Sequence, residues 1–147
     1  MKILSKSGIY GVLACLYLDR YSPAVGYIAV KEIGQKLQIP YSYLSKIIQS
    51  LSSSGIVKTR RGSGGGIALN VSSSQILVKQ IVEAVEGPIA IPNSLIEFER
   101  PVGGMQFVSK VDEWLSLKSQ IEKLFDTLTL ERLSSTTDIT VSGTLIK

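Results

Sequence analysis

The order of apolar and polar residues along the chain predicts five helices and one β-hairpin. Each helical stretch places apolar residues at i, i+3, i+4 and i+7, a spacing that gathers them on one face of a helix. Glycine or proline follows several of these stretches, as is usual where a helix ends. The predicted helices cover residues 5–20, 30–37, 39–54, 72–86 and 107–133, and the predicted hairpin covers residues 56–69.

The predicted helix at residues 39–54 has one apolar and one polar face. Its apolar stripe consists of Leu44, Ile47, Ile48 and Leu51. The opposite face is rich in hydrogen-bond donors and acceptors and poor in negative charge, which suits a groove of DNA. This polar face carries Ser42, Tyr43, Ser45, Lys46 and Gln49.

The predicted hairpin has a basic, glycine-rich tip. Gly55 ends the preceding helix, because glycine adopts the left-handed conformation of a C-terminal cap without a side-chain clash. Residues 56–59 and 67–69 form the two arms, and residues 60–66, RRGSGGG, form the tip. A helix that leads into a basic-tipped hairpin is typical of a winged helix, with residues 30–37 as the first helix of a helix-turn-helix pair. The expected fold class is therefore mainly α with a small β-hairpin.

Two other helices are expected to support this unit. Ser5 is the expected cap of the first helix, whose apolar stripe of Ile9, Val12, Leu13, Leu16 and Tyr17 is expected to face the core. Cys15 lies off the centre of this stripe and is expected to be a partly buried thiol without a redox role. Ser72 and Gln75 have the spacing of a capping box, which predicts that the fourth helix starts there.

The C-terminal helix carries more apolar surface than one neighbouring helix needs. Leu115 and Phe125 widen a stripe that already follows a 3.5-residue alternation. Packing onto its own domain accounts for part of this stripe, and the excess predicts self-association. The residues expected at the dimer interface are Phe107, Val111, Trp114, Leu117, Ile121, Leu124 and Leu128.

Positive charge is concentrated in the half of the chain that contains the predicted wing. The chain has a net charge of +4. Residues 1–72 contain nine Lys and Arg and two acidic residues, so their net charge is +7. Residues 73–147 contain seven Lys and Arg and ten acidic residues, so their net charge is −3. A positive surface attracts phosphates and releases their counterions, so the expected partner is double-stranded DNA.

These patterns divide the chain into four parts. Residues 1–87 form the expected winged helix-turn-helix domain, residues 88–106 a loop with three prolines, residues 107–134 the dimerisation helix and residues 135–147 a tail. No apolar run reaches the length of a membrane span and no signal peptide is recognisable, so a cytoplasmic protein without membrane contact is expected.

The same residues resemble the Rrf2 family of bacterial transcription regulators. Members share a tyrosine-leucine pair that opens the recognition helix and an RGxGGG wing, which match the run YLSKIIQSLSSSGIVKTRRGSGGGIAL at residues 43–69. The agreement extends to SKSGIYGVLACLYL at residues 5–18 and to IVEAVEGP at residues 81–88. It therefore covers about the first 88 residues, and the three motifs in register are specific where each alone is weak.

The resemblance implies a role for each residue of the candidate DNA interface. The minor-groove arginine of the family maps onto Arg61, beside Arg60, Gly62 and Ser63 at the tip. The alternative is that both arginines contact phosphates only. In the recognition helix, Ser42 and Tyr43 match positions that touch DNA in the family. Lys46 is expected to donate to guanine or phosphate, and Gln49 to phosphate.

Several positions depart from the family pattern. Ala29 replaces a usual Ser or Thr cap, Gln38 replaces a common glycine in the turn, and Pro40 replaces a capping serine. Proline is acceptable in the first turn of a helix, so the turn is expected to be altered and not abolished. Many relatives carry glutamate at the position of Ser45. A serine hydroxyl reads bases less selectively, which changes the expected operator sequence and not the binding.

The loop at residues 88–106 also lacks the cysteines that hold an iron–sulfur cluster in some members. The loop contains neither Cys nor His, so no metal and no cofactor is expected. The loop and the underside of the dimerisation helix remain candidates for binding a small-molecule or protein effector, or the loop is simply a connection.

The sequence thus predicts a regulator that binds a palindromic operator as a homodimer. The alternative is a protein-interaction module that keeps the winged-helix fold but binds DNA weakly or without specificity. An enzyme is not expected, because histidine is absent and no Ser or Cys has a neighbouring base in a recognised pattern. The glycine-rich tip also fails as a nucleotide cradle, since it lacks the GxxxxGK[ST] spacing.

Overall fold

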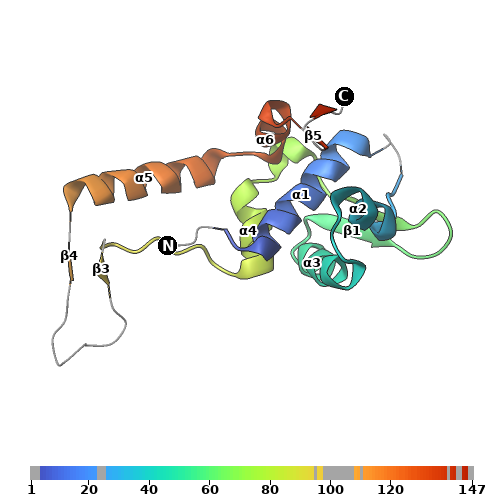
Figure 1. Cartoon of the computed structure of the whole chain (residues 1–147), viewed down its shortest axis with the longest axis horizontal. Coiled ribbons are helices and arrows are strands. Elements are labelled where there is room, and N and C mark those ends of the chain that lie inside the picture. The colour runs from blue at the N-terminus through green and yellow to red at the C-terminus, as the bar shows by residue number, and fades with distance from the viewer. Residues whose placement is uncertain are drawn as a thin grey trace.

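A computed structural model of the chain consists of a helical body from which one helix projects (Figure 1). It describes residues 4–22, 26–94, 96–97, 108–109, 111–138, 140–141 and 144–145. The elements are α1 (Lys6–Tyr21), α2 (Val30–Leu37), α3 (Tyr41–Ser53), β1 (Val57–Arg60), β2 (Gly66–Leu69), the 3₁₀ helix η1 (Ser73–Gln75), α4 (Val78–Glu86), β3 (Ile96–Glu97), β4 (Val108–Ser109), α5 (Asp112–Thr127), α6 (Leu130–Thr136), β5 (Thr140–Val141) and β6 (Thr144–Leu145).

The central helix of the body is α1, which packs against α2, α3, α4 and α6. Ser5 caps it as predicted, but neighbours on several sides bury more of the helix than one stripe. Cys15 is therefore fully buried, where partial burial was expected. Ile9 was expected in the core but is 44% exposed, so this part of the prediction was wrong.

The helix-turn-helix pair α2 and α3 forms despite the three departures from the family pattern at Ala29, Gln38 and Pro40. Ala29 precedes α2 without a side-chain cap, and Pro40 occupies the N-cap of α3 in the same way. Gln38 adopts the left-handed conformation at φ 55°, which glycine would adopt without strain. The Ile39 amide then donates to the Gly34 carbonyl at 2.9 Å, which closes the turn.

The wing is an antiparallel hairpin of β1 and β2, and Ile28 forms an isolated bridge with β2. Arg60 pairs with Gly66, so the strands reach one residue further than predicted and the tip is residues 61–65. Ile28 forms a bridge with Ile67 through two backbone hydrogen bonds of 2.9 and 2.8 Å. A Cβ on Gly66 would lie 2.1 Å from the Ile28 carbonyl oxygen, so only glycine allows this approach.

The fourth helix starts later than its expected capping box. Residues 73–75 form the 3₁₀ turn η1, which is followed by extended backbone. Helix α4 begins at Val78, where the side chain of Gln80 accepts a hydrogen bond from the Leu77 amide at 2.8 Å. The prediction of a cap at Ser72 for this helix was therefore wrong.

The sequence pattern predicted one helix over residues 107–133, but the described residues of this region form two helices, α5 and α6. The backbone around Thr129 is extended and forms a bridge with Leu77. The Val78 amide donates to the Leu128 carbonyl at 2.9 Å, and the Leu130 amide donates to the Ile76 carbonyl at 2.8 Å. This pairing ends α5 and starts α6, whose first residue, Leu130, is completely buried in the body.

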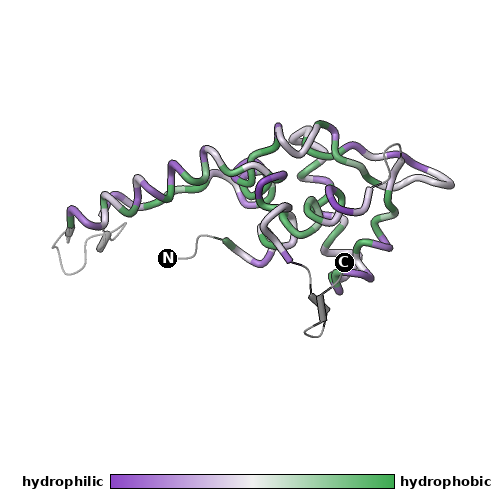
Figure 2. The backbone as a smooth tube through the Cα atoms, turned by 90° about the horizontal axis from the view of Figure 1, so that it is seen from above, coloured by the Kyte–Doolittle hydropathy of each residue, from purple (hydrophilic) through white to green (hydrophobic). Residues whose placement is uncertain are grey.

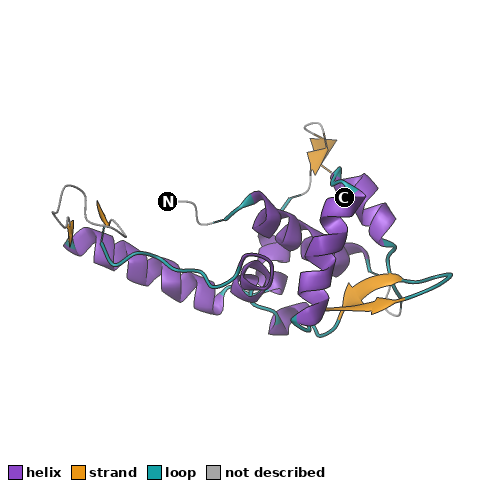
Figure 3. Ribbon diagram, turned by 90° about the horizontal axis from the view of Figure 1, so that it is seen from below, coloured by secondary structure: helices purple, strands orange, loops and turns teal. Residues whose placement is uncertain are grey.

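Helix α5 projects from the body (Figures 1 and 2). It contains no buried residue. A segment of the chain, residues 88–94, runs beside it (Figure 3). Trp114 Nε1 donates to the Pro92 carbonyl at 2.9 Å, and Lys118 hydrogen bonds to Asn93. Phe107, the first expected interface residue, lies outside the described residues. Within them, no helix combines the length and the apolar character needed to cross a bilayer.

Candidate nucleic-acid interface

The recognition helix α3 turns its apolar stripe inward and its polar face outward. Leu44 and Leu51 are completely buried, and Ile47 and Ile48 nearly so. Ser42, Lys46 and Gln49 are exposed. The four apolar contacts therefore fix the rotation of the helix about its own axis, and this rotation decides which polar side chains reach solvent.

Tyr43 is attached to the start of α1. Its hydroxyl group shares a hydrogen bond of 2.5 Å with Ser7 Oγ, and its ring meets that of Tyr10 edge to face, with centroids 5.6 Å apart. The side chain still has 38% of its surface exposed. Tyr43 thus links the first turn of the recognition helix to α1 while it remains accessible.

Ser45 has only part of its hydrogen-bonding capacity free. Its hydroxyl donates to the Tyr41 carbonyl one turn earlier at 2.8 Å, a common arrangement for serine inside a helix. The hydroxyl oxygen can still accept a hydrogen bond. Because its proton is already donated to the backbone, Ser45 is left as an acceptor.

Tyr27 restrains Arg60 at the end of β1, next to the tip of the wing. The Arg60 guanidinium carbon lies 5.7 Å from the ring centroid of Tyr27, and Lys58 Nζ lies 5.8 Å from the same centroid. Such cation–π contacts fix a long side chain against an aromatic face. Arg61 is the next residue and is exposed at the start of the tip, as are Gly62 and Ser63.

The tip of the wing is a tight turn. The Gly65 amide donates to the Gly62 carbonyl at 3.0 Å. A Cβ on Gly65 would lie 2.3 Å from the Arg60 carbonyl oxygen, which excludes any side chain there. The backbone of the tip is consequently thin enough to approach a narrow groove.

Positive charges of this surface are not neutralised by nearby carboxylates. The two ion pairs within the described residues, Lys79–Asp126 and Lys118–Glu122, involve α4 and α5. Lys46 and Arg61 have no such pair within this part of the chain. Their charge is therefore available to phosphates.

Three residues near the interface carry no signal in the sequence. Ser7 and Tyr10 contact Tyr43, and Tyr27 contacts Arg60. Tyr27 lies in a segment without periodicity, and Ser7 and Tyr10 lie on a helix whose pattern indicates only core packing. A tertiary contact between distant segments leaves no mark on local spacing, so these partners required the structure.

The only cysteine of the chain is unsuited to chemistry. Cys15 is completely buried in α1, and this burial raises the pKa of its thiol to about 12. A neutral, inaccessible thiol is neither a nucleophile nor a ready metal ligand.

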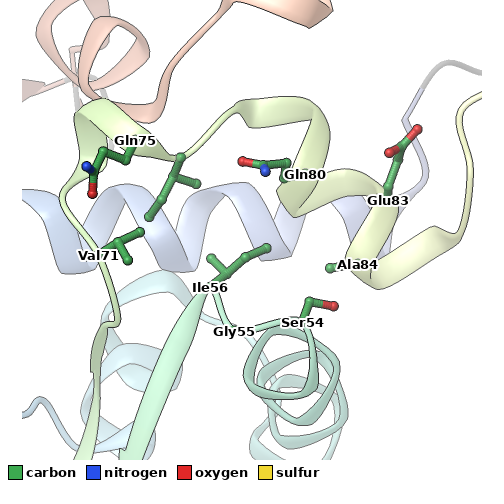
Figure 4. Close-up of a pocket in the computed structure, with 9 residues that line it drawn as sticks. Ser54, Gly55, Ile56, Val71, Gln75, Gln80, Glu83 and Ala84 are labelled. Atoms are coloured by element: carbon green, nitrogen blue, oxygen red, sulfur yellow. The ribbon is translucent and has the colours of Figure 1, made fainter.

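A hollow of about 390 Å³ lies on another part of the body, between the end of α3 and α4 (Figure 4). Gln80 accepts from the Leu77 amide, and Glu83 Oε1 accepts from the Ile89 amide at 3.1 Å. Figure 4 shows the Glu83 carboxylate turned away from Ile56 and Val71 on the opposite wall. Two of the polar side chains that line the hollow, Gln80 and Glu83, are thus already engaged by backbone amides.

Comparison with known families and sequences identifies relatives along almost the whole chain. The Rrf2 family, described as an iron-dependent transcriptional regulator, matches residues 4–136. The HTH-type transcriptional regulator CymR of Bacillus subtilis is 31% identical over 138 residues, which cover 94% of this chain and 93% of CymR. The regulator IscR of Serratia proteamaculans is 28% identical over 141 residues, which cover 96% of this chain and 84% of IscR.

Solved structures show the same likeness. The structure of CymR, the global cysteine regulator of B. subtilis, matches with a TM-score of 0.75 at 29% identity and covers 94% of this chain and all of that one. The structure of T. potens IscR matches with a TM-score of 0.66 at 27% identity, and the match covers 92% of this chain and 87% of the IscR chain. The similarity thus extends past the wing into the C-terminal helices.

Proposed function

The chain belongs to the Rrf2 family of transcription regulators, and we propose that it binds a palindromic operator as a homodimer without an iron–sulfur cluster. Its winged helix-turn-helix fold and its relatives make it a DNA-binding regulator. The observation that carries the finer proposal is the joint exposure of Lys46 and Gln49 on α3 and of Arg61 on the wing, on a surface with unpaired positive charge.

In the proposed complex, the first turns of α3 enter the major groove. Ser42, Ser45 and Lys46 face base edges, and Gln49 lies close to a phosphate. Arg61 reaches toward the minor groove, where a narrow groove deepens the negative potential. Arg60, Gly62 and Ser63 line the backbone next to it, with Arg60 held by Tyr27.

The homodimer proposal is supported by the unpaired apolar side of α5. Leu117 and Leu124 are seven residues apart, so they lie on one side of the helix, and they are 47% and 49% exposed. Trp114, Ile121 and Leu128 are half-buried, with Val111, on the adjoining side. A second copy that packs on α5 would cover Leu117 and Leu124. Binding to a palindromic operator requires the two recognition helices of this dimer to lie about 34 Å apart, one turn of DNA.

The residues of the chain do not fit an iron–sulfur cluster. Such clusters are held by cysteine thiolates, and Cys15 is buried in the core with a raised thiol pKa. Residues 88–106 contain no Cys or His in the sequence. Whatever signal this regulator receives, we infer that it does not act through thiolate-bound iron in one subunit.

Fluorescence anisotropy tests the proposal directly. The purified protein is titrated against a labelled duplex from the region upstream of its own gene and against a scrambled duplex of equal length. We expect tighter binding to the first, with affinity falling by orders of magnitude between about 50 and about 200 mM salt. Equal, weak binding to both duplexes would instead support a protein-interaction module that has kept the fold.

A further inference from the structure

Glu86, the last residue of α4, hydrogen bonds to the start of α1. Its Oε1 accepts from the Ser5 amide at 2.7 Å and from the Gly8 amide at 2.8 Å, and it also accepts from the Ser5 hydroxyl. The Ser5 hydroxyl itself is 3.4 Å from the Gly8 amide. The carboxylate of Glu86 is therefore the closer cap of α1, although it is 78 residues away from Gly8 in the chain.

The start of α1 is shaped to receive this carboxylate. A Cβ on Gly8 would lie 2.1 Å from Glu86 Oε1, so any side chain at this position would displace the carboxylate. The amides at a helix N-terminus carry partial positive charge, which makes a negative group favourable here. Hydrogen bonds to a charged acceptor are also stronger than those to a neutral one.

The same turn of α1 contacts the recognition helix. Ser7 lies between Ser5 and Gly8, and its hydroxyl shares the 2.5 Å hydrogen bond with Tyr43. Tyr10, one turn later, contacts the ring of Tyr43. A shift in the first turn of α1 would consequently move both groups that hold Tyr43.

The first turn of α3 has no cap of its own from a side chain. Pro40 occupies its N-cap and offers no side-chain acceptor. Helix ends without such partners are prone to fray. The attachment of Tyr43 to α1 is therefore one of the side-chain contacts, beside the burial of Leu44, that order the residues expected to enter the major groove.

We propose that Glu86 is a positioning residue for operator recognition. It fixes the first turn of α1, and Ser7 and Tyr10 in turn fix Tyr43 and the first turn of α3. This inference rests on the proposed function, because it gives Glu86 an effect on a DNA surface that it does not touch. The inference predicts that loss of Glu86 weakens sequence-specific binding, because base contacts need a fixed α3. Phosphate contacts, which do not need a fixed α3, should be little affected.

The test compares Glu86→Gln with Glu131→Gln, a control that removes the same charge from an exposed position in the first turn of α6. Anisotropy is measured on the upstream and scrambled duplexes, and circular dichroism checks the fold. We expect Glu86→Gln to lower affinity for the upstream duplex about tenfold, the effect of one charge-assisted hydrogen bond, with little change on the scrambled duplex. Glu131→Gln should bind both duplexes like the unaltered protein.

A double-mutant cycle identifies the route. Ser7→Ala in the Glu86→Gln background should add little further loss of specific affinity, because both changes release the same tyrosine. Amide hydrogen exchange over residues 41–49 of the free protein should speed up in Glu86→Gln and in Ser7→Ala, but not in Glu131→Gln.

The outcomes separate this inference from the proposed function. Failure of the unaltered protein to distinguish the duplexes would overturn the proposed function, and hydrogen exchange would then still show whether Glu86 orders the first turn of α3. Unchanged exchange over residues 41–49 in Glu86→Gln would overturn the inference. So would an equal loss of affinity on both duplexes, or full additivity with Ser7→Ala.

Discussion

The ring of Tyr27 lies under the guanidinium group of Arg60, 5.7 Å from its central carbon, and restrains this arginine at the end of β1, next to the tip of the wing. The neighbouring Arg61 has no such partner among the described residues and extends from the first residue of the tip. The two arginines are adjacent in sequence but differ in freedom, and this difference separates their expected roles.

Arg61→Ala should weaken operator binding by about 1–3 kcal/mol and relax the sequence preference, because the side chain is expected to read the minor groove. Anisotropy on the upstream and scrambled duplexes measures both effects. Arg60→Ala is the matched control, with a smaller loss expected on both duplexes alike. An equal loss on every duplex for Arg61→Ala would show that Arg61 contacts phosphates only.

The double variant Leu117→Glu, Leu124→Glu should be monomeric. Burying two carboxylates without partners in an apolar interface costs far more than such a contact supplies. Sedimentation equilibrium measures the mass, and operator affinity should fall with it. Leu115→Glu is the control, because Leu115 is 39% exposed but lies about 200° around the helix from Leu117. A double variant that stays dimeric would place the interface elsewhere.

Cys15 should resist thiol reagents until the protein unfolds. Burial raises its pKa from an ordinary 9.0 to about 12, so folding favours the neutral thiol. This stabilisation is fully present below pH 9 and is lost as pH rises from about 9 to about 12, since the unfolded chain releases the proton first. Labelling with a chromogenic disulfide, with and without denaturant, checks the first point. Rapid labelling of the folded protein would contradict it.

Comparison of urea unfolding with Cys15→Ala isolates the pH effect. The variant loses buried packing and should be less stable at every pH. Its stability should also fall less steeply above pH 9 than that of the unaltered protein, because it has no thiol to ionise in the unfolded chain.

Gln38→Gly should stabilise the fold by about 0.5–1 kcal/mol, because glycine adopts the left-handed conformation without the strain of a side chain. Gln38 has a φ of 55° at the end of α2. Urea unfolding measures the change. Gln35→Gly, on an exposed position inside α2, should instead destabilise by up to about 1 kcal/mol. Equal destabilisation by both changes would mean that the Gln38 side chain makes a compensating contact.

Local patterns in the sequence predicted the helix-turn-helix pair and the wing. Leu44, Ile47, Ile48 and Leu51 recur at helical spacing, and Gly55 follows the end of α3. The glycine-rich tip lies between the two strands, although the strands reach one residue further than predicted. The resemblance to the Rrf2 family, which rested on these motifs, is confirmed by the family match and by the sequence relatives. The roles of individual residues in DNA binding and in dimerisation stay predictions.

Other features depended on contacts between distant segments. The break in the C-terminal helix arises because residues 128–130 pair with residues 76–78, which overrides a continuous helical pattern. The late start of α4 depends on the same pairing, which keeps Ile76 and Leu77 extended.

The sequence by itself determined that the helix-turn-helix pair and the hairpin form, which face of α3 is apolar and which half of the chain carries the positive charge, since each depends on the residue order or on neighbours within one or two turns. Only the tertiary structure decided that Glu86 caps α1, that Ser7 holds Tyr43 and that Tyr27 holds Arg60. The physical reason is that a hydrogen bond or a ring contact depends on distance in space, and residues far apart along the chain come within that distance only after the core has packed.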